Sequence, residues 1–179
     1  MAGQSIVIMG VSGCGKSSVG AELARRLGAK LIDGDDLHPK ANIQKMADGH
    51  PLNDDDRAPW LERLNDAAYS LRHKNEVGFI VCSSLKRRYR ECLRKGNPEM
   101  IFLYMKGNFD VILSRLKARA GHYMPTELLQ SQFDALEEPG VDEKDVLHVD
   151  INGSFDDVVE RGMAALSEAG VTPRRNQAA

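Results

Sequence analysis

The chain has 179 residues, of which 42% are hydrophobic and 28% are charged, a balance typical of one soluble globular domain. Its formal net charge of -2 lacks the basic excess of a nucleic-acid-binding protein, and no stretch approaches the roughly 20 apolar residues of a membrane span. The cysteines and histidines show no disulfide or metal-ligand spacing and no signal peptide is visible, so we expect a cytoplasmic protein without nucleic-acid or membrane partners.

Apolar runs alternate with stretches of helical periodicity along the chain. Strands are expected at 5–9, 30–33, 77–82, 100–105 and 146–149. Helices are expected at 16–27, from Pro39 to near Gly49, from Pro59 onward, and at 86–95, 110–119, 126–136 and 155–166. This alternation predicts an α/β fold, in which a parallel sheet is covered by helices on both faces. We expect one domain at 1–170 and a flexible tail at 171–179.

The turn after the first predicted strand matches the phosphate-binding pattern G-x-x-x-x-G-K-[ST], directly before an amphipathic helix. Glycines let such a loop fold closely around phosphate oxygens, and the start of the helix adds its positive dipole end. We expect Lys16 to reach the β- and γ-phosphates of a nucleotide and Ser17 to ligate Mg²⁺. The expected nucleotide-binding residues of this loop are Gly10, Val11, Ser12, Gly13, Cys14, Gly15, Lys16, Ser17 and Ser18.

Acidic residues follow the second predicted strand rather than the third. The third strand ends in Cys82-Ser83-Ser84, without the carboxylate that holds Mg²⁺ in many ATPases and GTPases. Asp33 and Asp35 are two positions apart, so in an extended segment their side chains face the same way. One carboxylate could then support Mg²⁺ while the other accepts a proton from a substrate hydroxyl. A solvated acidic turn is the alternative.

Several longer motifs narrow the class of kinase. They are Asp33-Gly34-Asp35-Asp36-Leu37-His38-Pro39, Asn42-Ile43-x-Lys45-Met46, Pro51-Leu52-Asn53-Asp54-Asp55-Asp56-Arg57-x-Pro59-Trp60-Leu61, Ile80-Val81-Cys82-Ser83-Ser84-Leu85-Lys86, Arg115-Leu116-x-Ala118-Arg119-x-Gly121-His122 and Gln132-Phe133-x-x-Leu136-Glu137. In these motifs the sequence resembles the gluconate kinase (gluconokinase) family, from about Ser5 to the last predicted helix.

The resemblance implies the P-loop kinase fold of shikimate and nucleoside-monophosphate kinases, with strand order 2-3-1-4-5 and a small helical lid at about 119–136. It implies ATP-dependent phosphorylation of D-gluconate to 6-phospho-D-gluconate, with ATP and Mg²⁺ as cofactors. It also implies a cytoplasmic homodimer. Two alternatives remain open, a P-loop kinase for another small hydroxyl acceptor and a nucleotide-binding module without catalysis.

Side chains after the second strand are assigned to the metal and the acceptor. Both Asp33 and Asp35 are expected substrate contacts that accept from the hydroxyls of gluconate. By similarity to shikimate kinases, Asp33 is also placed on the metal side and Asp35 on the substrate side as the catalytic base. His38 could donate a hydrogen bond to a substrate hydroxyl, and a surface histidine is the alternative reading of this position.

Cationic residues are expected to anchor the carboxylate of gluconate. Arg57 could bind it in two-point geometry, and a charge pair with the acidic run 54–56 is the alternative. Ser84 and Lys86 follow the third strand, at the sheet edge where ligands of parallel sheets bind, and are expected substrate contacts. The neighbouring arginines are expected to form a solvated helix face: Arg87, Arg88 and Arg90.

Two further arginines are assigned to the nucleotide. Arg115 and Arg119 are four positions apart and therefore share one face of a helix. The resemblance places them at the entrance of the lid, where they would neutralise charge in the transition state, an effect worth roughly 10³–10⁵ in rate in other phosphoryl-transfer enzymes. Arg119 therefore joins Lys16 and Asp35 as a catalytic residue, and His122 is an expected substrate contact. An ordinary basic helix is the alternative.

Overall fold

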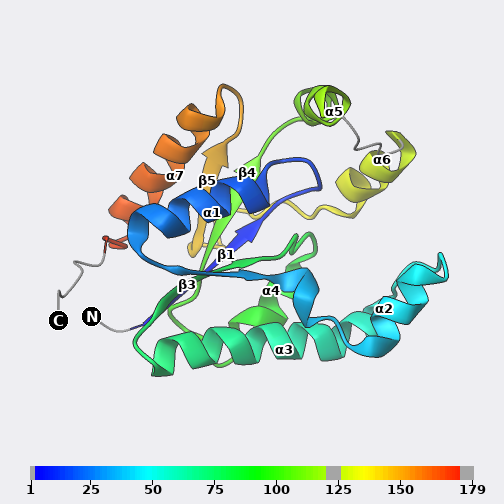
Figure 1. Cartoon of the computed structure of the whole chain (residues 1–179), viewed down its shortest axis with the longest axis horizontal. Coiled ribbons are helices and arrows are strands. Elements are labelled where there is room, and N and C mark those ends of the chain that lie inside the picture. Colours follow the sequence, from blue (N-terminus) through cyan, green and yellow to red (C-terminus); the bar gives the residue numbers. More distant parts are fainter. Residues whose placement is uncertain (1–2, 120–125, 174–179) are drawn as a thin grey trace.

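The computed structural model describes residues 3–119 and 126–173. Within these residues five strands form one sheet in which all neighbours are parallel. They are β1 Gln4–Met9, β2 Lys30–Asp33, β3 Val77–Val81, β4 Ile101–Lys106 and β5 Val146–Asp150. Their order across the sheet is β2-β3-β1-β4-β5, which confirms the predicted order and places β1 at the centre (Figure 1).

Helices cover both faces of the sheet, as predicted. They are α1 Lys16–Leu27, the 3₁₀ helix η1 Gly34–Leu37, α2 Lys40–Ala47, α3 Asp54–His73, α4 Arg87–Arg94, α5 Phe109–Ala118, α6 Thr126–Ala135 and α7 Phe155–Glu168. α1 and α7 lie on one face, and α3 and α4 lie on the other (Figure 1). In the described ranges, none of the helices combines the length and apolar character needed to cross a membrane.

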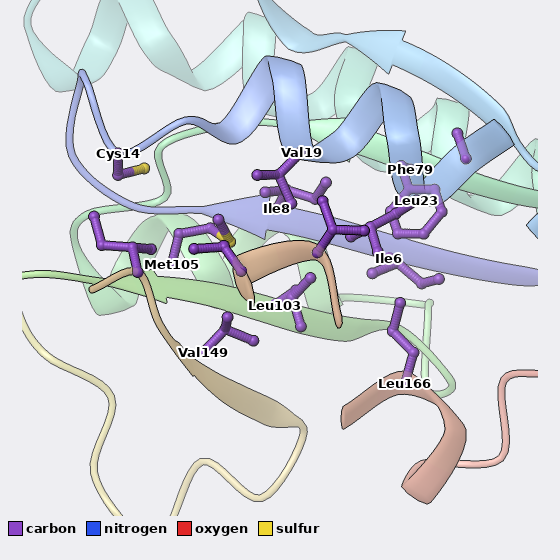
Figure 2. Packing of buried hydrophobic residues seen from close by; sticks show 14 of the residues in the cluster. Ile6, Ile8, Cys14, Val19, Leu23, Phe79, Leu103, Met105, Val149 and Leu166 are labelled. Carbon is purple, nitrogen blue, oxygen red and sulfur yellow. The ribbon is translucent and has the colours of Figure 1, made fainter. Parts of the chain in front are cut away.

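The central strand β1 is buried on both faces, and its side chains alternate between two hydrophobic clusters. Ile6 and Ile8 pack in the same cluster as Leu23 of α1 (Figure 2). Val7 and Met9 point to the opposite face, toward α3. A strand covered on both faces needs an unbroken apolar run, and this explains why the segment 6–9 carries no polar residue.

The helix α3 begins at Asp54, ahead of Pro59, where the sequence analysis placed its start. The Asn53 side chain accepts the N–H of Asp56 at 2.8 Å, while the Asp56 carboxylate accepts the N–H of Asn53 at 2.9 Å. This reciprocal cap outweighs the preference of proline for the first helical position, so the prediction was wrong. Pro59 has no N–H to donate to the carbonyl of Asp55 in the helix. Both residues are exposed, so water can donate to this carbonyl instead.

The chain remains packed against the core for a short distance after α7. Val171 is buried, and its N–H donates to the carbonyl of Leu166 at 2.9 Å. Of the expected tail, residues 174–179 lie outside the described part of the chain.

Candidate active site

The loop between β1 and α1 wraps around the N-terminus of α1, with glycines at positions that require them. Gly13 has φ +83°, and a Cβ there would lie 2.7 Å from the Leu116 side chain. Gly15 caps α1 with φ +92°, a left-handed conformation that residues with a Cβ disfavour. The side chains of Val11 and Cys14 are buried in the core and anchor the loop. A loop of this shape directs backbone N–H groups and the helix dipole toward one anion.

A cavity of about 220 Å³, here the phosphate compartment, adjoins this loop. Its walls bring together predicted nucleotide, metal and catalytic residues, namely Lys16, Ser17, Ser18, Asp33, Asp35 and Arg119. The Lys16 ammonium donates to the carbonyls of Gly10 at 2.9 Å and Val11 at 3.0 Å. These bonds hold the positive charge against the loop, beside the carboxylates of the compartment.

A cavity of about 350 Å³, here the nucleoside compartment, lies between the phosphate loop, the end of α5 and the start of α7. It shares four lining residues with the phosphate compartment: Gly13, Gly15, Ser18 and Arg119. Arg115 also lines it, and its guanidinium donates to the carbonyls of Ile151 and Gly153, the latter at 3.0 Å. The structure thus separates the two arginines, because Arg119 borders the phosphate compartment while Arg115 is held in the wall of the nucleoside compartment.

A third cavity, of about 560 Å³, adjoins the phosphate compartment but shares no described lining residue with the nucleoside compartment. It is here called the acceptor compartment. Five of the predicted substrate residues line it: Asp35, His38, Arg57, Ser84 and Lys86. It shares Ser12, Asp35 and Ser83 with the phosphate compartment. The three compartments therefore form a row, with the phosphate compartment in the middle and Asp35 where it meets the acceptor compartment.

Asp33 ends β2 in extended conformation, but Asp35 lies in the 3₁₀ helix η1 rather than in the extended segment assumed from the spacing of the two carboxylates. The Asp33 side chain caps η1 by accepting the N–H of Asp35 at 3.0 Å. Trp60 of α3 fixes the same turn by donating its indole N–H to the carbonyl of Gly34 at 2.7 Å. Both carboxylates still line the phosphate compartment, and the Asp35 side chain is 84% exposed and accessible to a ligand.

The side chain of His38 is largely covered by its neighbours, so the alternative of a surface histidine is wrong. Its side chain is 7% exposed and stacks on Trp60 with ring centroids 4.2 Å apart. The Asn42 amide nitrogen lies 3.2 Å from Nδ1, which makes Nδ1 the acceptor and leaves the proton on Nε2. Burial lowers the pKa of His38 against the opposing effect of Asp35, whose carboxylate lies 3.8 Å from Nε2. The imidazole is therefore neutral and presents an N–H near Asp35.

Cations gather around Tyr89, a residue that the sequence analysis missed. Arg57 and Lys86 lie 5.7 and 5.8 Å from the centre of its ring, and all three side chains line the acceptor compartment. The Tyr89 hydroxyl donates to Asp54 at 2.5 Å, and Arg88 also pairs with this carboxylate. Arg57 donates to the Tyr89 hydroxyl at 3.5 Å and lies 4.0 Å from Asp54, at the limit of an ion pair, so the alternative of a charge pair with the acidic run stays open beside its place in the acceptor compartment.

Arg90 does not belong to a solvated helix face. Its side chain is 0% exposed and pairs with Glu143, which is buried as well. Arg87 and Arg88 are about half exposed, in agreement with the prediction for these two. The signal for Arg90 was weak, because its partner Glu143 lies far along the chain and Arg90 stands among other arginines of α4.

The comparisons with known proteins agree with this geometry. Residues 12–166 match the family model of shikimate kinase. The chain is 58% identical over 161 residues to the thermosensitive gluconokinase of Escherichia coli (strain K12), which covers 90% of this chain and 86% of the relative. The chain belongs to the gluconokinase family. The crystal structure of a gluconokinase from Sinorhizobium meliloti 1021 has a TM-score of 0.83 and 42% identity, and covers 92% of both chains.

Within this gluconokinase-family site, Gln132 of α6 connects to the phosphate loop. The Gln132 carbonyl oxygen accepts the N–H of Ser12 at 2.6 Å, and its amide nitrogen donates to the Ser12 hydroxyl at 2.8 Å. Gln132 also lines the acceptor compartment. It stands in one of the family motifs, but the motif did not reveal its partner.

Phe155 is a further residue that the sequence analysis did not assign. It opens α7, is 48% exposed, and lines the nucleoside compartment. His122, by contrast, was predicted as a substrate contact and lies outside the described residues, as does part of the expected lid.

Proposed function

We propose that this chain transfers the γ-phosphate of ATP to D-gluconate, with ADP and 6-phospho-D-gluconate as products. The acceptor compartment carries the proposal, because it meets the phosphate compartment at Asp35 and holds the cations Arg57 and Lys86. A polyol with a carboxylate needs hydroxyl acceptors and a cationic anchor. The 58% identity to a gluconokinase supports gluconate over other sugar acids.

The phosphate loop is proposed to hold the triphosphate, and the nucleoside compartment the base and ribose. The Ser17 hydroxyl and the Asp33 carboxylate line the phosphate compartment. Oxygen ligands of this kind fit Mg²⁺, which binds through one or two protein groups together with substrate phosphates and water. The bound ion would neutralise charge on the β- and γ-phosphates.

In the proposed reaction, O6 of gluconate attacks the γ-phosphorus while the bond from that phosphorus to the β,γ-bridging oxygen breaks. Asp35 accepts the O6 proton, since its carboxylate belongs to both compartments. Lys16 and Arg119 balance the charge of the transferring phosphoryl group. The N–H of neutral His38 can donate to a hydroxyl held beside Asp35.

The carboxylate of gluconate is proposed to bind Arg57 and Lys86. The Arg57 guanidinium offers two parallel donors, and the Lys86 ammonium adds a point charge. Ser84 donates its hydroxyl to the carbonyl of Cys82 at 3.2 Å, which leaves its lone pairs for a substrate hydroxyl. His122 is proposed as a further contact on the family resemblance alone.

The resemblance also supports a lid at 119–136 and a cytoplasmic homodimer, while length, net charge and hydropathy support a single domain at 1–170 that binds neither nucleic acid nor membrane. A closed lid would exclude water from the phosphate compartment and limit wasteful ATP hydrolysis. Light scattering on the purified chain tests the dimer, and should give twice the mass of 19.8 kDa.

The test of the proposed function is ADP release with ATP, Mg²⁺ and a panel of acceptors that includes gluconate, other sugar acids, shikimate and nucleoside monophosphates. Gluconate should be the preferred acceptor, and Lys16→Ala should lose about 10²–10³-fold in kcat. The matched control is Lys144→Ala, since Lys144 is an exposed lysine that lines none of the three compartments. This variant should retain full turnover. Preference for another acceptor would indicate a different small-molecule kinase, and nucleotide binding without turnover would indicate a binding module.

A further inference from the structure

The loop between β3 and α4 forms part of the acceptor compartment and is bound by three separate parts of the molecule. The carbonyls of Ser83, Ser84 and Leu85 accept, in that order, from the Gly10 N–H at 3.1 Å, the Arg90 Nη1 at 3.0 Å and the Glu137 N–H at 2.8 Å. The donors belong to the phosphate loop, to α4 and to the segment directly after α6. This short loop is therefore the junction of donor site, acceptor site and α6.

Ser84 holds this junction in an unusual backbone conformation. Its φ is +49°, in the left-handed region that is unfavourable for a residue with a Cβ. Such a conformation persists where the surroundings hold it. Ser84 is buried, with its hydroxyl bonded to the carbonyl of Cys82 and its own carbonyl bonded to Arg90. The direction of the neighbouring Ser83 and Lys86 side chains depends on this turn.

Arg90 uses all of its guanidinium nitrogens around the junction. Nε and Nη2 bind the two carboxylate oxygens of Glu143, each at 2.8 Å. Nη1 donates to the carbonyls of Ser84 and Leu85, at 3.0 and 3.3 Å, and Nη2 donates to the carbonyl of Glu137 at 2.9 Å. Lysine cannot reproduce this planar set of donors.

A second arginine on the same helix shares the carboxylate but not the loop. Arg94 donates to Glu143 at 2.7 Å and to Asp145 at 2.6 and 2.9 Å. Both acceptors, Glu143 and Asp145, lie in the segment directly before β5. Arg94 therefore represents the purely structural part of the ion-pair network, and it separates that part from the bonds that Arg90 makes to the acceptor loop.

We propose that Arg90 is a positioning residue for the phosphate acceptor, which it serves by holding the 83–86 loop and the end of α6 in one arrangement. The inference rests on the proposed function. Gluconate would lose contacts when the loop relaxes, whereas ATP binds mainly to the phosphate loop and the nucleoside compartment. Loss of Arg90 should therefore weaken gluconate more than ATP.

The experiment compares Arg90→Lys and Arg90→Met with the control Arg94→Met by steady-state kinetics and thermal unfolding. The Arg90 variants should raise KM for gluconate by about tenfold or more, with KM for ATP within about threefold of wild type. Arg94→Met should lower Tm and leave both KM values near wild type. The double variant Arg90→Met/Glu143→Leu removes the unpaired buried carboxylate, so the kinetics can be measured if the single variant does not fold.

The outcomes separate this inference from the proposed function. If wild-type protein does not phosphorylate gluconate, the proposed function fails. If the wild type is active but the Arg90 variants and Arg94→Met change KM for gluconate equally, Arg90 has only a structural role and the inference is overturned. Equal losses for gluconate and ATP in the Arg90 variants would overturn it as well.

Discussion

Asp35 occupies the boundary between the phosphate and acceptor compartments, while Asp33 lines the phosphate compartment. The two carboxylates are separated by one residue, yet only that of Asp35 also faces the acceptor compartment. Asp36, the next residue, lies outside the described walls of all three compartments, although it is exposed and acidic. It therefore provides a control of the same charge at nearly the same place.

Replacement of Asp35 should mainly affect the chemical step. Asp35→Asn keeps the shape of the side chain but removes the proton acceptor, and kcat should fall by about 10²–10⁴-fold with KM for ATP nearly unchanged. Asp36→Asn should keep kcat near wild type. Steady-state kinetics with gluconate check both, and a near-normal kcat for Asp35→Asn would reject Asp35 as the base.

Phe155 should bind the nucleobase. Its exposed ring opens α7 and lines the nucleoside compartment. Stacking of a base on an aromatic side chain is worth about 1–3 kcal/mol, so Phe155→Ala should raise KM for ATP by about fivefold to a hundredfold. Phe155→Trp should restore most of the affinity. An unchanged KM for ATP in Phe155→Ala would place the base elsewhere.

At the scale of elements, α6 is attached to the rest of the molecule by apolar contacts and by a pair of hydrogen bonds. Leu129 is fully buried in the core, and Phe133 packs edge-on against Phe109 of α5. Gln132 forms the polar attachment through its two hydrogen bonds to Ser12. The helix thus contacts the phosphate loop directly and forms part of the acceptor wall.

Removal of the polar attachment should affect catalysis. Gln132→Leu leaves the Ser12 N–H without its side-chain acceptor, and kcat/KM for gluconate should fall by about tenfold. The matched control is Gln130→Leu, since Gln130 is exposed on the same helix and bonds to Asp134. The control should keep wild-type kinetics. Equal effects of the two substitutions would assign the loss to α6 as a whole rather than to the contact with Ser12.

The same elements show which features the sequence could predict. The strands and the phosphate loop have local signals, since an apolar run or a glycine pattern is complete within about ten residues. The start of α3 is also encoded locally, in the reciprocal cap of Asn53 and Asp56, but the nearby Pro59 predicts a later start. The contacts of Gln132 with Ser12 and of Arg90 with Glu143 join segments far apart in the chain, and no local pattern identifies such partners.

Across the whole molecule, the ion pair of Arg90 and Glu143 ties α4 to the segment that precedes β5. Hydrogen bonds from Arg90 lower the pKa of Glu143 from 4.5 to about 2, against the opposing effect of burial. A carboxyl group with a depressed pKa in the folded state stabilises that state above its unfolded pKa. This contribution should be complete above about pH 4.5 and should be lost as the pH falls toward 2.

Glu143→Gln should lower the free energy of unfolding at neutral pH by about 3–5 kcal/mol, because Arg90 is left buried without a counter-charge. It should also flatten the pH dependence in the acid range. Asp142→Asn is the control, since this neighbour forms an exposed pair with Arg87 and should cost less than about 1 kcal/mol. Urea unfolding as a function of pH measures both. Wild-type stability and an unchanged acid slope in Glu143→Gln would contradict the assignment.

The row of three compartments has a consequence for the order of events in a catalytic cycle. No described residue lines both the nucleoside and the acceptor compartments, and the two meet only through the phosphate compartment between them. The proposed sites for the base and for gluconate thus share no described wall residue. We therefore predict that either substrate can bind first. Initial-rate plots with both substrates varied should intersect, and a dead-end analogue of either substrate should inhibit competitively against that substrate and noncompetitively against the other, whereas an uncompetitive pattern would indicate an obligatory order.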